Sequence, residues 1–319
     1  MLTNDPSSIP LTSQNRDRPT QLDPTFGRDS TNPKSPSKWD WHELLDSLLQ
    51  LGIALLLLCA SIVVQLIFSV VLLVPYALHR GITPSSPDFG LKFVEFATTD
   101  KTAILLQVWS LLPSHILTVV LVWLVITRFG RRPFLDSLGL RWSSGFEIWV
   151  SLGLGILMFG VASVTAWLIG ADKPTQLEQI VNSSLAARYA VAFLAVFTAP
   201  FVEELVYRGV LYSALQRIVG VTGAVAIVLG LFTLIHVPQY WPNVGIVVAV
   251  GLLSVALTLV RAYSGRLLPC VIIHLVFNGI QSVLLIAEAY VPQLRSTSEQ
   301  GLSILFWLVF HPFSVSQIL

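Results

Sequence analysis

Residues 189–215 read YAVAFLAVFTAPFVEELVYRGVLYSAL, an apolar run with two acidic residues and one arginine in its interior. A helix needs about 20 apolar residues to cross the hydrocarbon core of a bilayer, so this run is long enough to span a membrane. Charged side chains inside a span are costly, and they tend to face the bundle interior and to mark functional sites. The run therefore predicts a membrane span that carries part of a site at Glu203, Glu204 and Arg208.

The rest of the chain repeats this apolar pattern. Of the 319 residues, 54% are hydrophobic and 12% are charged, about half the charged share of a soluble domain. In lipid, only helices and closed barrels satisfy every backbone group, and continuous apolar runs lack the alternation of barrel strands. We predict an all-α, polytopic transmembrane bundle with seven or eight spans. Seven runs lie near residues 51–74, 103–126, 148–169, 189–215, 221–236, 244–260 and 267–287, and a shorter run at 302–319 is the candidate eighth.

The sequence divides into four segments. Residues 1–42 form a polar tail rich in Pro, Ser and Thr, which predicts disorder because too little apolar surface can be buried. The first apolar run is too long for a cleaved signal peptide, so it should remain as a span. We assign 43–186 to N-terminal transmembrane helices, 187–290 to a transmembrane core that carries the polar residues of the later spans, and 291–319 to a C-terminal segment with the candidate eighth span.

Charge predicts orientation and partners. Loops on one side of the predicted spans carry 12 Lys and Arg, against 6 on the other, so the N-terminus should be cytoplasmic. A net charge of +1 provides no field that would attract nucleic acid, which leaves the lipid bilayer as the expected partner. Tyr240 and Trp241 follow the fifth span and are predicted to mark the membrane interface, as Trp39 and Trp41 do before the first.

Three more polar residues lie in later spans: His236 in the fifth, and His274 and Asn278 in the seventh. With about 1.5 Å of rise per residue, Glu203, His236, His274 and Asn278 lie roughly 21, 21, 12 and 18 Å from the predicted cytoplasmic ends of their spans. All four depths fall inside a hydrocarbon core of about 30 Å. This common level predicts one site built by three helices.

Helical spacing separates the roles of the neighbouring acids. Glu204 and Arg208 are four residues apart with the acid first, which favours an ion pair within the helix. Glu203 points about 100° away from Glu204, so it is freer to face the bundle centre. His274 and Asn278 share one helix face. One turn before His236, the ring of Phe232 is placed to orient the imidazole.

Structural interpretations stand beside the functional ones. A histidine in a span is often only hydrogen-bonded to a carbonyl, the two acids and the arginine could form a packing network, and polar side chains can join helices. His115 and His311 lack comparable partners, so we interpret both as structural. Ser254 has no Gly-x-Ser-x-Gly motif around it, and a His-Glu-x-x-His zinc motif is absent from the sequence.

Three motifs resemble those of the CPBP intramembrane proteases, which include the type II CAAX prenyl endopeptidases and the bacterial Abi and bacteriocin-immunity proteins. The motifs are Glu203-Glu204-x-x-x-Arg208, Phe232-x-x-x-His236 and His274-x-x-x-Asn278, in the family's order. The resemblance implies an intramembrane endopeptidase that cuts a membrane-embedded or lipidated peptide, with the catalytic residues Glu203, His236, His274 and Asn278 and the supporting residues Glu204, Arg208 and Phe232.

Two mechanisms and one other class of function stay open. Glu203 could act as the general base for water, while His274 and Asn278 stabilise the oxyanion. Alternatively, Glu203, His236 and His274 could hold a divalent metal such as zinc. Asn is a poor zinc ligand but a good oxyanion donor, which favours the metal-free version. The competing function is a non-catalytic transporter, immunity or scaffold protein, although we find no repeated halves of the kind common in transporters.

Overall fold

The computed structural model describes residues 41–171 and 173–291, and these residues are almost entirely helical, with no strand among them. The predicted all-α class is therefore confirmed. Within these ranges, six helical stretches are long and apolar enough to cross a membrane. The predicted tail, up to residue 40, and the candidate eighth span at 302–319 lie outside the described residues. The six stretches are Ser47–His79, Lys101–Ile126, Ile148–Ile169, Leu185–Tyr240, Val244–Ser264 and Leu268–Ala287.

The stretch Leu185–Tyr240 accounts for the difference between six stretches and seven predicted spans. It has 56 residues, which as one straight helix would be roughly 84 Å long against a hydrocarbon core of about 30 Å. Gly220 interrupts it with φ 73° and ψ 177°, a conformation open to glycine and strained for other residues. The chain turns back there, because Tyr240 and Gln176 line one cavity although Gln176 precedes the stretch. The stretch thus holds two of the predicted spans.

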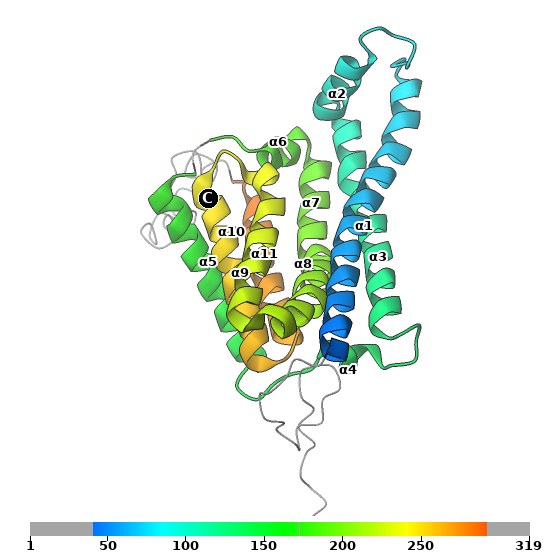
Figure 1. Ribbon diagram of the computed structural model, residues 1–319. Helices are drawn as coiled ribbons and strands as arrows, with labels where there is room; N and C mark the ends of the chain where they lie inside the picture. The colour runs from blue at the N-terminus through cyan, green and yellow to red at the C-terminus, as the bar shows by residue number, and fades with distance from the viewer. Residues whose placement is uncertain (1–40, 172, 292–319) are drawn as a thin grey trace, which may run out of the picture. The chain divides into compact units, whose positions relative to one another are not determined.

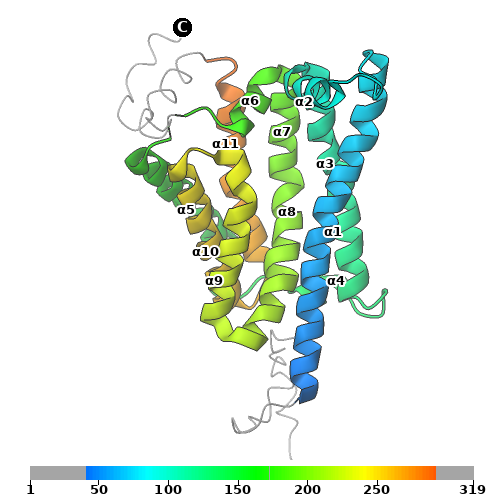
Figure 2. The same cartoon turned by 45° about the horizontal axis from the view of Figure 1, so that its top comes forward.

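The first part of the bundle is a pair of long helices. Helix α1 (Trp41–His79) runs beside α3 (Lys101–Ile126), with α2 (Phe89–Thr99) at the end where they connect (Figures 1 and 2). Asp100 caps α3 by accepting hydrogen bonds from the backbone N–H groups of Thr102 and Ala103. The short α4 (Phe134–Leu138) follows α3. This pair supplies one wall of the cavity through α3.

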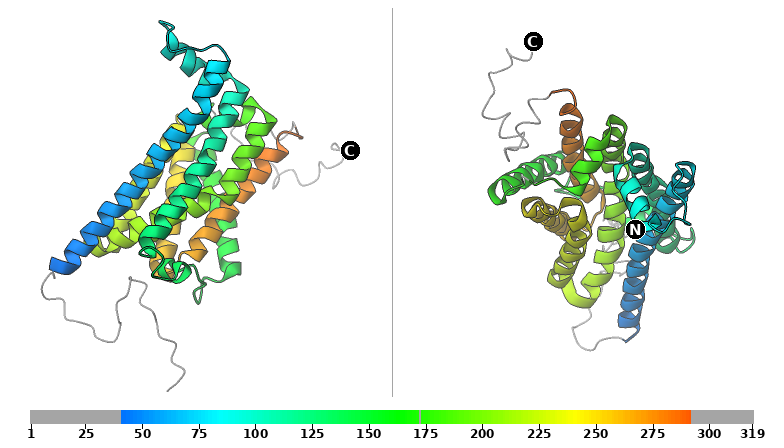
Figure 3. Two further views of the ribbon diagram at one scale, coloured as in Figure 1. Left: turned by 90° about the vertical axis from the view of Figure 1, so that its right-hand side faces the viewer. Right: turned by 90° about the horizontal axis from the view of Figure 1, so that it is seen from above.

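The second part places the predicted polar residues on packed helices. Helices α5 (Ile148–Ile169), α10 (Val244–Ser264) and α11 (Leu268–Ala287) share an apolar core that includes Phe159, Leu257 and Phe277. The view from above in Figure 3 separates these helices from α1 and α3. The remaining elements are α6 (Gln176–Ser183), α7 (Leu185–Phe197), α8 (Ala199–Glu204), the π-helical turn η1 (Leu205–Leu211) and α9 (Tyr212–Tyr240).

Candidate active site

The first motif lies where the helix that carries it is irregular. Thr198, between α7 and α8, has φ −121° and ψ −48°, and Pro200 has no N–H to continue the helical ladder. After Glu204 the chain forms the π-helical turn η1. Single π-helical turns inside α-helices frequently occur at functional sites. The two irregularities enclose the short helix α8, which carries Glu203 and Glu204.

Glu204 and Arg208 form a fully buried ion pair. Nη1 of Arg208 donates to Oε1 of Glu204 at 2.8 Å, and both side chains are 0% exposed. The ion pair that the sequence predicts is thus present. Removing one partner of such a pair leaves an uncompensated charge in a low-dielectric interior. Glu204 is therefore a buried carboxylate whose charge is compensated by Arg208.

Two polar residues of α10 complete the surroundings of Arg208. Nη2 of Arg208 donates to Oγ and to the backbone oxygen of Ser254 at 3.0 and 3.1 Å, and Nε donates to Oγ1 of Thr258 at 3.3 Å. Phe232 covers the guanidinium, with its ring centroid 4.6 Å from Cζ. Sequence analysis did not identify Ser254 and Thr258 as partners of Arg208. Their i, i+4 spacing in an otherwise apolar span was the available signal.

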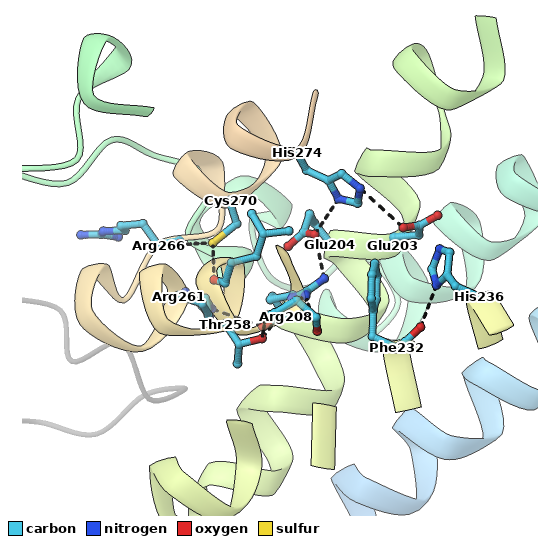
Figure 4. A network of polar contacts seen from close by, with 12 residues as sticks. Glu203, Glu204, Arg208, Phe232, His236, Thr258, Arg261, Arg266, Cys270 and His274 are labelled. Atoms are coloured by element: carbon cyan, nitrogen blue, oxygen red, sulfur yellow. Dashed lines mark hydrogen bonds and ion pairs between the residues drawn. The ribbon is translucent and has the colours of Figure 1, made fainter. Parts of the chain in front are cut away.

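His274 bridges the two neighbouring glutamates (Figure 4). Its Nδ1 lies 2.9 Å from Oε1 of Glu204, and its Nε2 lies 3.8 Å from Oε2 of Glu203. Glu204, paired with Arg208, accepts the Nδ1–H, so Nε2 is the nitrogen that faces Glu203. The hydrogen bond made by one ring nitrogen thus determines which role the other nitrogen can take.

His236 is oriented from its own helix. Its Nδ1 lies 2.7 Å from the backbone oxygen of Phe232, which can only accept, so Nδ1 carries the proton and Nε2 is left for other contacts. The imidazole also packs on the Phe232 ring at a centroid distance of 4.5 Å, as the sequence predicts. In Figure 4, Phe232 stands between Arg208 and His236. The same phenyl ring therefore touches the buried ion pair and the second motif's histidine.

Asn278 joins α11 to α7. Its Nδ2 donates to the backbone oxygen of Ala195 at 2.9 Å. This contact is the helix-joining role that sequence analysis gave as the structural interpretation. An amide carries two N–H groups, so one remains for a ligand. Asn278 is thus both a link between helices and a positioned donor.

A cavity of ≈ 620 Å³ brings the predicted residues together. Glu203, His236, His274 and Asn278 all line it, whereas Glu204 and Arg208 do not. The side chain of Glu203 is 23% exposed, in contrast to its buried neighbour. Most of the lining is apolar, and three uncharged amides join it: Gln176, Gln239 and Gln281. The cavity therefore combines an apolar wall with a small set of convergent polar groups, which is typical of ligand sites.

Two lining residues correct the sequence analysis. His115 does have a partner, because its Nδ1 lies 2.8 Å from Oγ1 of Thr198, and it faces the same cavity from α3. Tyr240 also lines the cavity and stacks parallel to His236 at 6.4 Å, since α9 continues through Pro238. It was predicted only as an interfacial aromatic residue. The sequence did contain a signal for His115, because an ionisable side chain inside a span is costly and tends to mark a functional site. His311 lies outside the described residues.

The metal interpretation has a geometric test. A zinc site needs at least three protein ligands at about 2.0–2.3 Å from one point. Across residues 41–171 and 173–291, no group of three or more His, Cys, Asp or Glu side chains is placed to hold a metal ion. The described arrangement of Glu203, His236 and His274 does not fit a metal ion, and we assign no step to one.

Comparison with known families agrees with the motifs. A family model described as type II CAAX prenyl endopeptidase Rce1-like matches residues 185–280, a segment that contains all three motifs. No curated protein and no solved structure matches the chain. The resemblance to the CPBP and CAAX proteases is confirmed for this segment.

Proposed function

We propose, from the premise that residues 185–280 are an Rce1-like domain of the CAAX protease family, that this membrane protein is an intramembrane endopeptidase in which Glu203 activates water. The substrate would be a peptide or protein that is itself membrane-associated, such as one with a prenylated, CAAX-like C-terminus. Its hydrolysis would take place in the cavity shared by the four predicted residues.

The contrast between the two glutamates carries this proposal. Glu204 is consumed by Arg208 and His274, whereas Glu203 reaches the cavity with its Oε2 beside the free nitrogen of His274. A general base must lie within hydrogen-bond reach of the proton that it removes. Glu203 Oε2 and His274 Nε2 lie 3.8 Å apart. A water that contacts both atoms from the cavity would meet that requirement.

The proton taken from water has two acceptors at the cavity. Glu203 Oε2 and His274 Nε2 lie 3.8 Å apart, and Nδ1 of His274 is already bonded to Glu204. A proton removed from the attacking water by Glu203 can therefore be shared with Nε2 of His274.

The oxyanion requires donors that are already in place. The second N–H of Asn278 is available because the first is fixed on Ala195. Once His274 holds the shared proton, its Nε2–H becomes a second donor. Such preorganised donors typically contribute about 10²–10³ in kcat each.

The test is cleavage by the purified full chain in lipid nanodiscs. The probes are quenched-fluorescent peptides with apolar segments, and one set has a prenylated C-terminus. We expect cleavage by wild type and a loss of about 10²–10⁴ in rate with Glu203→Gln, since general-base catalysis is of this size. Equal behaviour of the two proteins across all peptides would reject the protease function and support a binding protein.

A further inference from the structure

The third histidine of the cavity, His115, has no place in the three motifs and lies outside the segment that matches the family model. Its Nδ1 lies 2.8 Å from Oγ1 of Thr198, whose own hydroxyl donates to the backbone oxygen of Leu194 at 3.1 Å. A hydroxyl has one hydrogen, so Thr198 accepts from His115. The proton of the neutral imidazole is therefore on Nδ1, and Nε2 is an acceptor.

The environment of His115 places that nitrogen at the cavity. The side chain lines the same cavity as Glu203, His115 from α3 and Glu203 from α8. Within the described residues, the hydrogen bond of His115 is made by Nδ1 and none is made by Nε2. Nε2 is also not among the fully buried polar atoms that lack a partner. The two side chains therefore face one common cavity.

Peptide hydrolysis leaves one task that the motifs do not assign. Water adds its oxygen to the carbonyl carbon and gives a proton to Glu203. When the C–N bond breaks, the bond electrons stay on nitrogen, and the leaving amine needs a proton. A second group that lines the same cavity as the base suits this transfer, because the base stays near the attacking oxygen.

We propose that His115 relays the proton that Glu203 removes from water to the leaving amine nitrogen. Nε2 takes the proton from Glu203 and passes it to nitrogen as the C–N bond breaks, which returns both groups to their starting states. The balance is one water consumed, with one carboxyl and one amine formed. This role rests on the proposed protease function.

The experiment exploits the two nitrogens of the ring. In His115→Asn, the amide nitrogen occupies the place of Nδ1 and can keep the bond to Thr198, but nothing replaces Nε2. The matched variant Thr198→Val keeps the imidazole and removes its partner. Each protein is tested in nanodiscs on a quenched-fluorescent amide peptide and on the same peptide with an ester at the scissile bond, whose alkoxide leaves with less need of a proton.

We expect His115→Asn to lower the amide rate at least 10²-fold, in the range of general-acid catalysis, and the ester rate by less than tenfold. Thr198→Val keeps the imidazole and only loosens the ring, so it should lower the amide rate by a smaller factor than His115→Asn does, and the ester rate by less still. Equal losses on amide and ester in His115→Asn, or a wild-type amide rate, would overturn the relay. Neither outcome touches the protease function, which depends on the separate comparison of wild type with Glu203→Gln.

Discussion

Glu203 and Glu204 are adjacent in sequence and have opposite surroundings. Glu204 is 0% exposed and is shared between Arg208 and His274, whereas Glu203 is 23% exposed and faces the cavity. Their side chains leave the helix on different faces, because successive residues are turned by about 100°. Two identical carboxylates are thus divided into one that is paired inside the bundle and one that faces the cavity.

The buried residues Glu204 and Arg208 determine the geometry of the residues that line the cavity. His274 has its ring fixed by Glu204, and Phe232 contacts both the guanidinium and His236. A change on the buried side should therefore lower stability and activity together. A change on the cavity side should lower activity alone.

The largest effect is expected on activity from Glu203→Gln. The amide keeps the size of the side chain and cannot take the proton, so turnover should fall by about 10²–10⁴. The midpoint of thermal unfolding in nanodiscs should stay close to that of wild type, because Glu203 is partly exposed. A large drop in that midpoint would place Glu203 on the structural side of the comparison.

Arg208→Met should cause the largest loss of folding stability. It leaves Glu204 buried without its cation, and breaking a buried pair costs about 3–5 kcal/mol. Unfolding of the purified protein by denaturant in detergent micelles measures this loss. Its control is the double variant Arg208→Met with Glu204→Gln, which removes both charges and should recover much of the stability. No recovery would mean that the hydrogen bonds of Arg208 to α10 dominate.

A smaller loss of stability is expected where α5 packs tightly against α11 at Gly155. A Cβ added at Gly155 would lie 2.7 Å from Cβ of Val276, so Gly155→Ala must push α11, which carries His274. Overpacking of this kind costs about 1–3 kcal/mol. Gly153→Ala is the matched control on the same helix, since nothing lies within 4 Å of its added Cβ. Equal thermal unfolding midpoints for the two variants would contradict the close contact.

The smallest effect lies far from both glutamates, at the start of α3. Asp100→Ala removes a side chain that caps two backbone N–H groups, which should cost about 0.5–2 kcal/mol and leave turnover unchanged. Asp88 precedes α2 without a capping hydrogen bond, so Asp88→Ala is the control with the smaller loss. Denaturant unfolding with parallel activity assays measures both variants. A drop in turnover for Asp100→Ala would show that activity also depends on the start of α3, away from the two glutamates.

The sequence predicts much of this arrangement because a bilayer restricts the solutions. Apolar runs can only become helices, and i, i+4 spacing identified the pair of Glu204 with Arg208. The position of His115 in a span was visible in the sequence, but its contact with Thr198 was not, because the approach of α3 to α8 depends on packing between distant segments. The second contact of Glu204, with His274, was hidden for the same reason.

The buried ion pair also has a consequence for membrane insertion. Because Glu204 and Arg208 are one helical turn apart, their charges can neutralise each other within a single helix, before any other helix arrives. A span that carries a matched pair enters lipid at a lower cost than one with two separate charges. Glu203 has no such partner on its own helix, so its carboxylate is the charge of this motif that would still have to be accommodated in the bilayer.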